Sequence, residues 1–359
     1  MYRVHSIDHL RGILALCILF YHLHCWLFTA PDAGDLLGKL GVYGVSAFFI
    51  ISGMSIHKSY ANVLFTKVSL TGFFVRRFFR LAPVYWIVLL LVLVLGFIES
   101  KNYHPQIKTI LLNISLTFGI FKPKDYMVIG GWSIGVEVAF YALFPFAIAL
   151  ARNSASKLVL FFVSFVIFIY LSLYIDLGKN IWHQYINPLN HMVFFTFGIL
   201  ASECHDRFKG SIKDKCVYAV FLAAFLCFYF YPSGGEINSI LFGVDRILLS
   251  FFTMIFCCAV MFISYANTGA LCRVMDFFGK VSYSVYLLHG VFFSYAQRII
   301  YPYFSMNESR QIAITYGIFI PTVILVSYFI YRYIEQPAIR LGKKRTFIER
   351  REVNTQPYA

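Results

Sequence analysis

The stretch from Leu10 to Phe28 reads LRGILALCILFYHLHCWLF. It is almost wholly apolar and long enough for an α-helix to cross a hydrocarbon layer of roughly 30 Å. Two ionisable side chains, Arg11 and His22, lie inside it, eleven positions apart. Eleven helical steps return to within about 20° of the same face, some 16 Å along the axis. We predict a transmembrane helix with Arg11 near one surface and His22 near mid-bilayer, where an ionisable group needs a partner or a water-filled cavity.

The composition of the whole chain extends this interpretation. Of its 359 residues, 59% are hydrophobic and only 13% are charged, and the mean hydropathy is +0.70. A soluble domain has about a quarter of its residues charged. The net charge of +14 lies in short basic clusters between apolar runs, which is typical of cytoplasmic loops and does not favour a nucleic-acid partner. The eight cysteines form no CxxC pair and are predicted to be inert thiols, with no metal expected.

The fold class predicted is an all-α polytopic membrane protein of about ten transmembrane helices. The segment Ile107–Phe121 is shorter and contains polar residues, and we expect it to be re-entrant or interfacial on the outer side. With this assignment both termini are cytoplasmic and most basic residues face the cytoplasm, whereas a crossing segment would place the basic tail outside. Residues 1–340 would form one membrane domain and residues 341–359 a short basic cytoplasmic tail. The predicted spans are Leu10–Phe28, Val42–Tyr60, Leu81–Ile98, Trp132–Leu150, Leu158–Asp176, Asn190–Ala201, Cys216–Tyr231, Asp245–Tyr265, Val281–Ile300 and Ile312–Tyr333.

The first candidate site is formed by Asp8, Arg11 and His22. A neutral imidazole is a common general base for removing a proton from a hydroxyl group. Alternatively, Asp8 and Arg11 form an interfacial i,i+3 pair and His22 only hydrogen-bonds a neighbouring helix. The shared face, the depth in the membrane and the second histidine at His24 favour the functional interpretation.

Glu137 is the second candidate, because it lies about a turn and a half into an otherwise apolar span. A carboxylate at that depth requires a partner, and His22 or an arginine is the natural one. A purely structural buried ion pair is the alternative.

Arg76, Arg77 and Arg80 form the third candidate, at the cytoplasmic start of a span. Arg76 and Arg80 are spaced i,i+4 and share a helix face, which suits a polyphosphate ligand. The alternative is plain positive-inside anchoring of the helix. The remaining candidates are His289, Ser52, Tyr85, Trp132 and Ser133. Pro337, which follows Glu335 and Gln336, is expected to end the last helix.

Five motifs in this order resemble the membrane acyltransferase family 3 over residues 7–340, nearly the whole chain. They are Arg11 and His22 spaced as Arg-x10-His, RRFFRLAPVY (residues 76–85), WSIGVE (132–137), SYSVYLLH (282–289) and IEQP (334–337).

The resemblance implies acyl transfer, most often of acetyl from acetyl-CoA, to a hydroxyl of an extracytoplasmic glycan or its lipid-linked precursor. It also implies a bacterial cytoplasmic membrane and a need for Arg11, His22 and the Arg76 cluster. Some members carry a C-terminal SGNH-type esterase domain. We expect this chain to resemble the stand-alone members that modify O-antigen, exopolysaccharide or small acceptors.

These observations favour a membrane O-acyltransferase that uses acetyl-CoA as donor and a surface or polyprenyl-linked glycan as acceptor. The rival interpretation is a transporter or flippase with an intramembrane His/Glu site. Transporters commonly show paired repeats with broken helices, and no such pairing is evident here.

Overall fold

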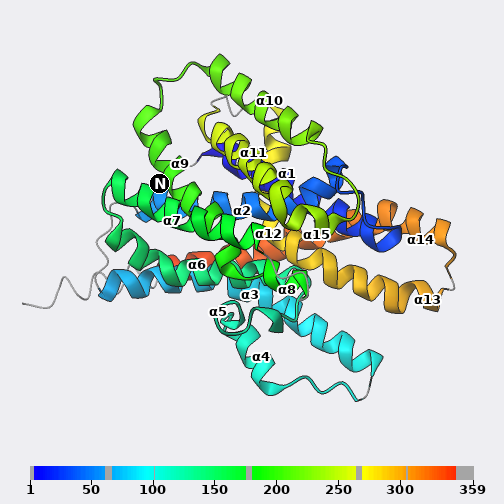
Figure 1. Ribbon diagram of the computed structural model, residues 1–359. Helices are drawn as coiled ribbons and strands as arrows, with labels where there is room; N and C mark the ends of the chain where they lie inside the picture. The colour runs from blue at the N-terminus through cyan, green and yellow to red at the C-terminus, as the bar shows by residue number, and fades with distance from the viewer. Residues whose placement is uncertain are drawn as a thin grey trace, which may run out of the picture. The chain divides into compact units, whose positions relative to one another are not determined.

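The computed structural model describes residues 4–60, 67–100, 102–174, 180–263, 269–304 and 306–344 (Figure 1). Every regular element within these ranges is helical, and seven helices are long and apolar enough to cross a membrane. The predicted class, an all-α polytopic membrane protein, is confirmed. The seven helical segments are His5–Leu27, Leu36–Tyr60, Ser69–Glu99, Gly131–Leu150, Ser154–Leu173, Gly243–Phe262 and Glu308–Lys344.

Three other predicted spans are also helical. Helices α9 (Met192–Phe208) and α10 (Asp214–Phe230) have 17 residues each, and α12 (Ala270–Tyr295) has 26. The predicted span ends Asp176 and Tyr265 lie outside the described residues, as does the tail from position 345 onward.

The chain divides into two compact units. The first comprises Met1–Ala61 and Leu150–Tyr286, and the second comprises Asn62–Ala149 and Leu287–Ala359. The first contains α1 (His5–Leu27), α2 (Leu36–Tyr60), α7 (Ser154–Leu173), α8 (Ile181–Tyr185), η2 (Pro188–Asn190), α9, α10, η3 (Ile237–Leu241), α11 (Gly243–Phe262) and α12 up to Tyr286. The second contains α3 (Lys67–Glu99), α4 (Ile107–Ile114), α5 (Phe118–Phe121), η1 (Pro123–Asp125), α6 (Gly131–Leu150), the rest of α12, η4 (Ala296–Ile300), α13 (Tyr301–Tyr303), α14 (Glu308–Ile314), η5 (Thr315–Phe319), α15 (Ile320–Ile330) and η6 (Tyr331–Glu335).

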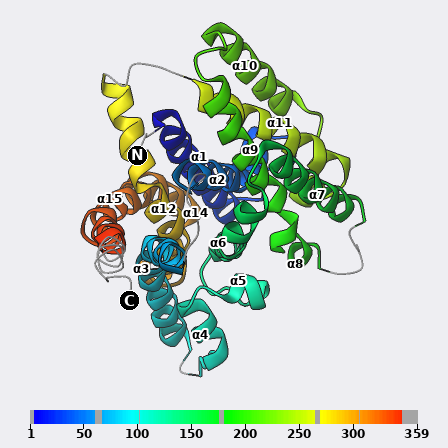
Figure 2. The same cartoon turned by 90° about the vertical axis from the view of Figure 1, so that its left-hand side faces the viewer.

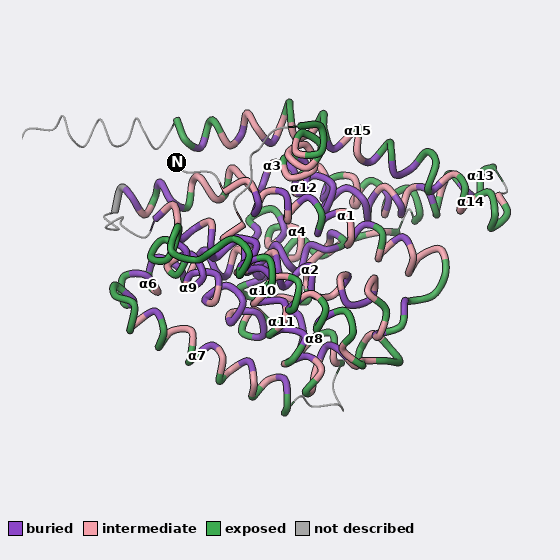
Figure 3. Tube along the Cα trace, turned by 90° about the horizontal axis from the view of Figure 1, so that it is seen from above, coloured by how far each residue is buried: buried purple, intermediate pink, exposed green. Residues whose placement is uncertain are grey.

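Helix α2 is the centre of the first unit, where it packs against α1, α9 and α11 (Figure 2). It is mostly buried, whereas α7 is largely exposed along its length (Figure 3). At the contact of α2 with α9, a Cβ on Gly53 would lie 3.2 Å from the Cα of Gly198, and a Cβ on Gly198 would lie 2.9 Å from the backbone nitrogen of Met54. Small residues let helix backbones approach this closely inside a membrane. These two glycines therefore fix the position of α9 against α2.

The segment predicted to be re-entrant forms two short helices, α4 and α5, rather than one spanning helix. They are separated at Leu116, a buried residue with a positive φ of 61°. The fully buried Asn113 ties this segment to its surroundings within the second unit. Its Oδ1 accepts bonds from the Tyr85 hydroxyl (2.6 Å) and the Met127 backbone nitrogen (3.1 Å), and its Nδ2 donates to the Thr109 and Asp125 carbonyl oxygens. All four hydrogen-bonding positions of the buried amide are thus used.

The expectation that Pro337 ends the last helix is wrong. The helix continues to Lys344, and its turn at Tyr331–Glu335, just before the proline, is a π-helix. Proline removes a backbone donor and clashes with the preceding turn of an α-helix. A wider π-turn is one way in which a helix absorbs such a disruption without ending.

Candidate active site

Arg11 is held between two helices of the first unit. Its guanidinium lies 3.5 Å from the Asp8 carboxylate on α1 and donates a 3.0 Å hydrogen bond to the Ser55 hydroxyl on α2. Its side chain and that of Asp8 are both 19% exposed. Asp8 lies fourteen residues before His22, about 21 Å along the same helix axis. Asp8 therefore orients Arg11, and it is too far away to orient His22.

His22 lies five residues before the end of α1 and is half-buried among aromatic side chains. Its ring stacks on Trp26, with centroids 5.3 Å apart and planes 11° apart, and is tilted against Tyr21 at 5.3 Å. Stacking limits the orientations that the imidazole can adopt. The predicted pairing of His22 with Glu137 joins residues of different units and remains a prediction.

Within the second unit, Glu137 lies close to the basic cluster. The Tyr141 hydroxyl, one turn later on α6, donates a hydrogen bond to the Glu137 carboxylate. The Arg77 guanidinium of α3 lies 5.4 Å from the centre of the Tyr141 ring and 5.7 Å from that of Phe73. The charges of Glu137, Arg77 and Arg80 all act on Tyr141. Glu137 and Arg77 thus meet at the same phenol. A direct arginine partner for Glu137 remains a prediction.

Tyr141 was not predicted from the sequence. Its position four residues after Glu137, on the same helix face, is the signal that could have identified it.

Among the remaining candidates, three are buried in the second unit: Tyr85 on α3, and Trp132 and Ser133 at the start of α6. Tyr85 donates to Asn113, and Ser133 donates a 2.9 Å bond to the Gly130 carbonyl oxygen, so both hydroxyls serve local structure. Trp132 is 7% exposed.

The other two candidates are buried helix residues in different units. His289 on α12 is fully buried in the second unit. Ser52 of the first unit lies beside Gly53 at the contact of α2 with α9 and is also buried.

Arg246, which is only 2% exposed in the first unit, was also not predicted from the sequence. Its guanidinium donates to the side-chain and backbone oxygens of Asn190 at 3.2 and 2.9 Å. It lies 4.9 Å from the centre of the Phe168 ring and 5.4 Å from that of Tyr185. Burial raises the pKa of Tyr185 to about 12, although Arg246 and a hydrogen bond with Ser46 oppose this shift. Tyr185 therefore stays neutral beside the cation.

The structure thus groups the predicted residues into two sets. Asp8, Arg11, His22 and Ser52 belong to the first unit, and the others belong to the second unit. A family model described as an acyltransferase domain matches residues 4–332, which include every one of these positions. The chain belongs to this acyltransferase family. The family resemblance drawn from the five motifs is therefore confirmed.

Curated relatives of this acyltransferase-family chain are named O-acetyltransferases. The peptidoglycan O-acetyltransferase OatA of Listeria monocytogenes is 28% identical over 169 residues, which are 40% of this chain and 24% of that protein. A putative O-acetyltransferase of Staphylococcus aureus is 26% identical over 378 residues, covering 94% of this chain and 58% of the relative. The O-acetyltransferase OatA of Staphylococcus aureus is 26% identical over 375 residues, with the same coverage. The chain thus spans 24% to 58% of the length of these relatives. No solved structure matches it.

Proposed function

We propose that the protein is a membrane O-acetyltransferase that moves an acetyl group from cytoplasmic acetyl-CoA to a hydroxyl of a surface glycan or its lipid-linked precursor. The observation that carries this proposal is the family match across residues 4–332. Within this range, helix α1 holds both Arg11, which is fixed by its hydrogen bond, and the half-buried His22. The acceptor is an O-antigen, an exopolysaccharide or a related glycan. The name of the Listeria relative adds peptidoglycan to this class. The membrane is the bacterial cytoplasmic membrane.

Donor binding is assigned to Arg76, Arg77 and Arg80. The 3′-phospho-ADP group of acetyl-CoA is polyanionic, and guanidinium groups bind phosphate through two parallel hydrogen bonds. All three side chains are half-buried. Because the Arg77 guanidinium lies over the rings of Phe73 and Tyr141, its plane is fixed before the donor arrives.

Acetyl transfer is assigned to His22. The imidazole takes the proton of the acceptor hydroxyl while that oxygen attacks the thioester carbonyl carbon. The carbon–sulfur bond then breaks, and the proton passes to the departing CoA sulfur. Glu137 is the carboxylate proposed to orient the imidazole, since the Asp8 carboxylate is paired with Arg11. Arg11 lies about 16 Å before His22 along α1, on the approach from the cytoplasmic end. A transient acetyl-histidine would suit the same arrangement.

The test of this mechanism replaces His22 by alanine in the full-length protein in proteoliposomes. Radiolabelled acetyl-CoA and candidate glycans are supplied, and labelled glycan and free CoA are measured. We expect His22→Ala to reduce transfer to below a few per cent while the protein still inserts. His24→Ala is the matched control, because His24 is half-buried on the same helix and its ring packs on Phe28.

Transfer by His22→Ala above a few per cent of the wild-type rate would remove His22 from the mechanism. Transport of the label without covalent transfer to glycan would instead support the flippase interpretation.

The test of donor binding is the double variant Arg76→Ala/Arg80→Ala. We expect its KM for acetyl-CoA to rise roughly tenfold or more, because each charge-assisted hydrogen bond contributes about 1.5–3 kcal/mol. The control double variant, Arg207→Ala/Lys213→Ala, removes one charge from the last turn of α9 and one from just before α10, in a region predicted to face the cytoplasm. An unchanged KM in the first double variant would mean that the arginine cluster only anchors the helix at the cytoplasmic surface.

A further inference from the structure

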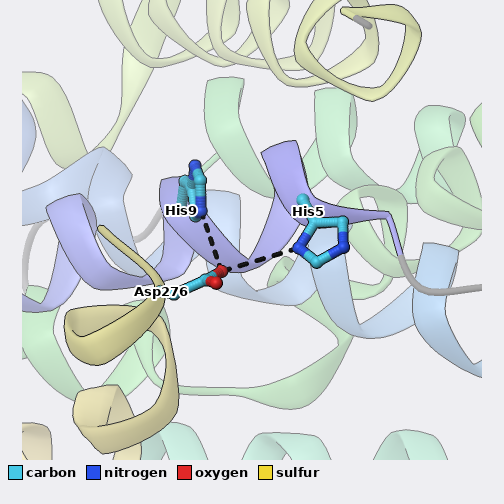
Figure 4. A group of neighbouring side chains, drawn as sticks. All are labelled: His5, His9 and Asp276. Carbon is cyan, nitrogen blue, oxygen red and sulfur yellow. Dashed lines mark hydrogen bonds and ion pairs between the residues drawn. The ribbon is translucent and has the colours of Figure 1, made fainter. Parts of the chain in front are cut away.

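A cluster of metal-binding side chains joins α1 to α12 in the first unit. His5 and His9 project from successive turns of α1 toward Asp276 of α12 (Figure 4). Asp276 Oδ1 lies 3.0 Å from His9 Nε2 and 3.5 Å from His5 Nδ1. One ligand atom from each residue lies within 4.8 Å of the other two. No residue of this cluster takes part in the proposed acetyl transfer.

The helix contact beneath the cluster fixes this geometry. His5 and His9 are spaced i,i+4 and therefore face the same way. Gly12 of α1 lies against the backbone of α12, because a Cβ on Gly12 would be 2.7 Å from the Gly279 nitrogen and 2.8 Å from the Phe278 carbonyl carbon. Gly12 and Gly279 each follow a cluster residue by three positions, so this backbone contact sets His9 opposite Asp276. The arrangement does not depend on long flexible side chains meeting by chance.

The donor set suits a divalent transition ion. Two imidazoles and one carboxylate bind zinc at about 2.0–2.2 Å, and three protein ligands leave a fourth position for water. Ligands of a single tetrahedral zinc ion then lie roughly 3.3 Å apart, and the two measured distances to Asp276 bracket this value. The side chains of His5, His9 and Asp276 are 40%, 9% and 20% exposed, so the cluster is partly desolvated and still reachable from water.

We propose that His5, His9 and Asp276 form a binding site for one zinc-class divalent ion that fastens the start of α1 to α12. The bound ion replaces the direct histidine–aspartate contacts with coordination bonds. Asp8 lies between the two histidines in the sequence, and Gly279 packs against its backbone. The ion would therefore also fix the helix turn from which Asp8 orients Arg11.

The experiment measures Co²⁺ and Zn²⁺ binding to the purified full-length protein in detergent after chelator treatment. Cobalt gives a visible absorption spectrum that reports its ligand set, and zinc displaces it. We expect one equivalent of cobalt with a spectrum of low coordination number. His9→Ala and Asp276→Asn should each weaken binding at least tenfold. His183→Ala is the control, because His183 is exposed on α8 and outside the cluster.

Thermal unfolding provides a second readout that is independent of activity. We expect saturating zinc to raise the melting temperature of the wild type by several degrees, since a ligand that binds only the folded state stabilises it. Asp276→Asn keeps the shape of the side chain and should abolish this increase. If His9→Ala does not fold, His9→Gln replaces it in both assays.

The proposal fails if the wild-type protein binds no cobalt, or if the cluster variants bind it as the control does. Either result would leave a His–Asp–His contact without an ion.

Discussion

Arg11 and His22 share one helix, as their spacing predicted, but they have different neighbours. Arg11 is held by one carboxylate and one hydroxyl, whereas His22 is held by aromatic stacking. A guanidinium with fixed hydrogen bonds is suited to binding an anionic group, and a half-buried imidazole is suited to exchanging a proton. In the proposed transfer, their separation of about 16 Å along α1 would have them act at different points.

Tyr141 contacts both Glu137 and Arg77 in the second unit, and a mutation can remove one contact while it keeps the other. Tyr141→Phe removes the hydroxyl that donates to Glu137 and keeps the ring beneath Arg77. We expect it to lower kcat roughly tenfold or more and to leave the KM for acetyl-CoA within about twofold, because a charge-assisted hydrogen bond contributes about 1.5–3 kcal/mol. Tyr141→Ala should also raise that KM, because it removes the support of Arg77. Steady-state kinetics in proteoliposomes distinguish the two effects.

The replacement Phe74→Leu is a suitable control, because Phe74 is exposed on α3 one position after Phe73. Equal KM and kcat for Tyr141→Phe and the wild type would mean that the contact with Glu137 has no role in turnover.

Small residues determine how the helices of the first unit pack. The contacts of α2 with α9 and of α1 with α12 each bring a glycine against a backbone. In a membrane the apolar surface of a helix gains little from leaving lipid, so close van der Waals packing contributes much of helix association. The glycines therefore contribute more to helix association here than the many exposed phenylalanines do.

Gly198→Ala tests this packing. The added Cβ would lie 2.9 Å from the Met54 nitrogen and 3.0 Å from the Ile50 carbonyl carbon, which is backbone that cannot move aside alone. Overpacking of this kind destabilises by roughly 1–3 kcal/mol. We expect a melting temperature several degrees lower in detergent. Gly317→Ala is the control, because nothing lies within 4 Å of its added Cβ and its φ is not positive.

A melting temperature for Gly198→Ala equal to that of the control would show that α9 can shift against α2. The close approach would then be incidental to stability.

The predicted topology of the chain can be tested by mutation. Cysteine variants at exposed positions, in a cysteine-free background, can be labelled with a membrane-impermeant maleimide in intact cells. Lys213→Cys should stay unlabelled until the membrane is permeabilised, and Glu236→Cys should be labelled at once, because the basic loop is predicted to face the cytoplasm. Asn102→Cys and Lys124→Cys flank the α4–α5 segment, and both should be labelled from outside. All four native side chains are exposed.

Opposite labelling at positions 102 and 124 would mean that residues 107–121 cross the membrane. The side assigned to every later loop would then be reversed.

Most of the helical architecture could be predicted from the sequence, because each transmembrane helix satisfies its backbone hydrogen bonds within a continuous segment. The length of an apolar run is therefore enough to identify it. Local exceptions were harder, as at Pro337, where the sequence predicts an end and the chain continues through a π-turn.

Hydropathy and residue type along the chain were enough to establish the class of the protein, the positions of most spans and the chemical types available at Arg11, His22, Arg77 and Glu137. Which side chains meet followed from the packing of the helices. In the structure, Tyr141 contacts both Glu137 and Arg77. Asp276 lies beside His5 and His9, although 267 positions separate it from His9 in the sequence. The physical reason is that hydropathy acts within one segment, whereas contacts between helices depend on rotation and close packing, which no single segment records.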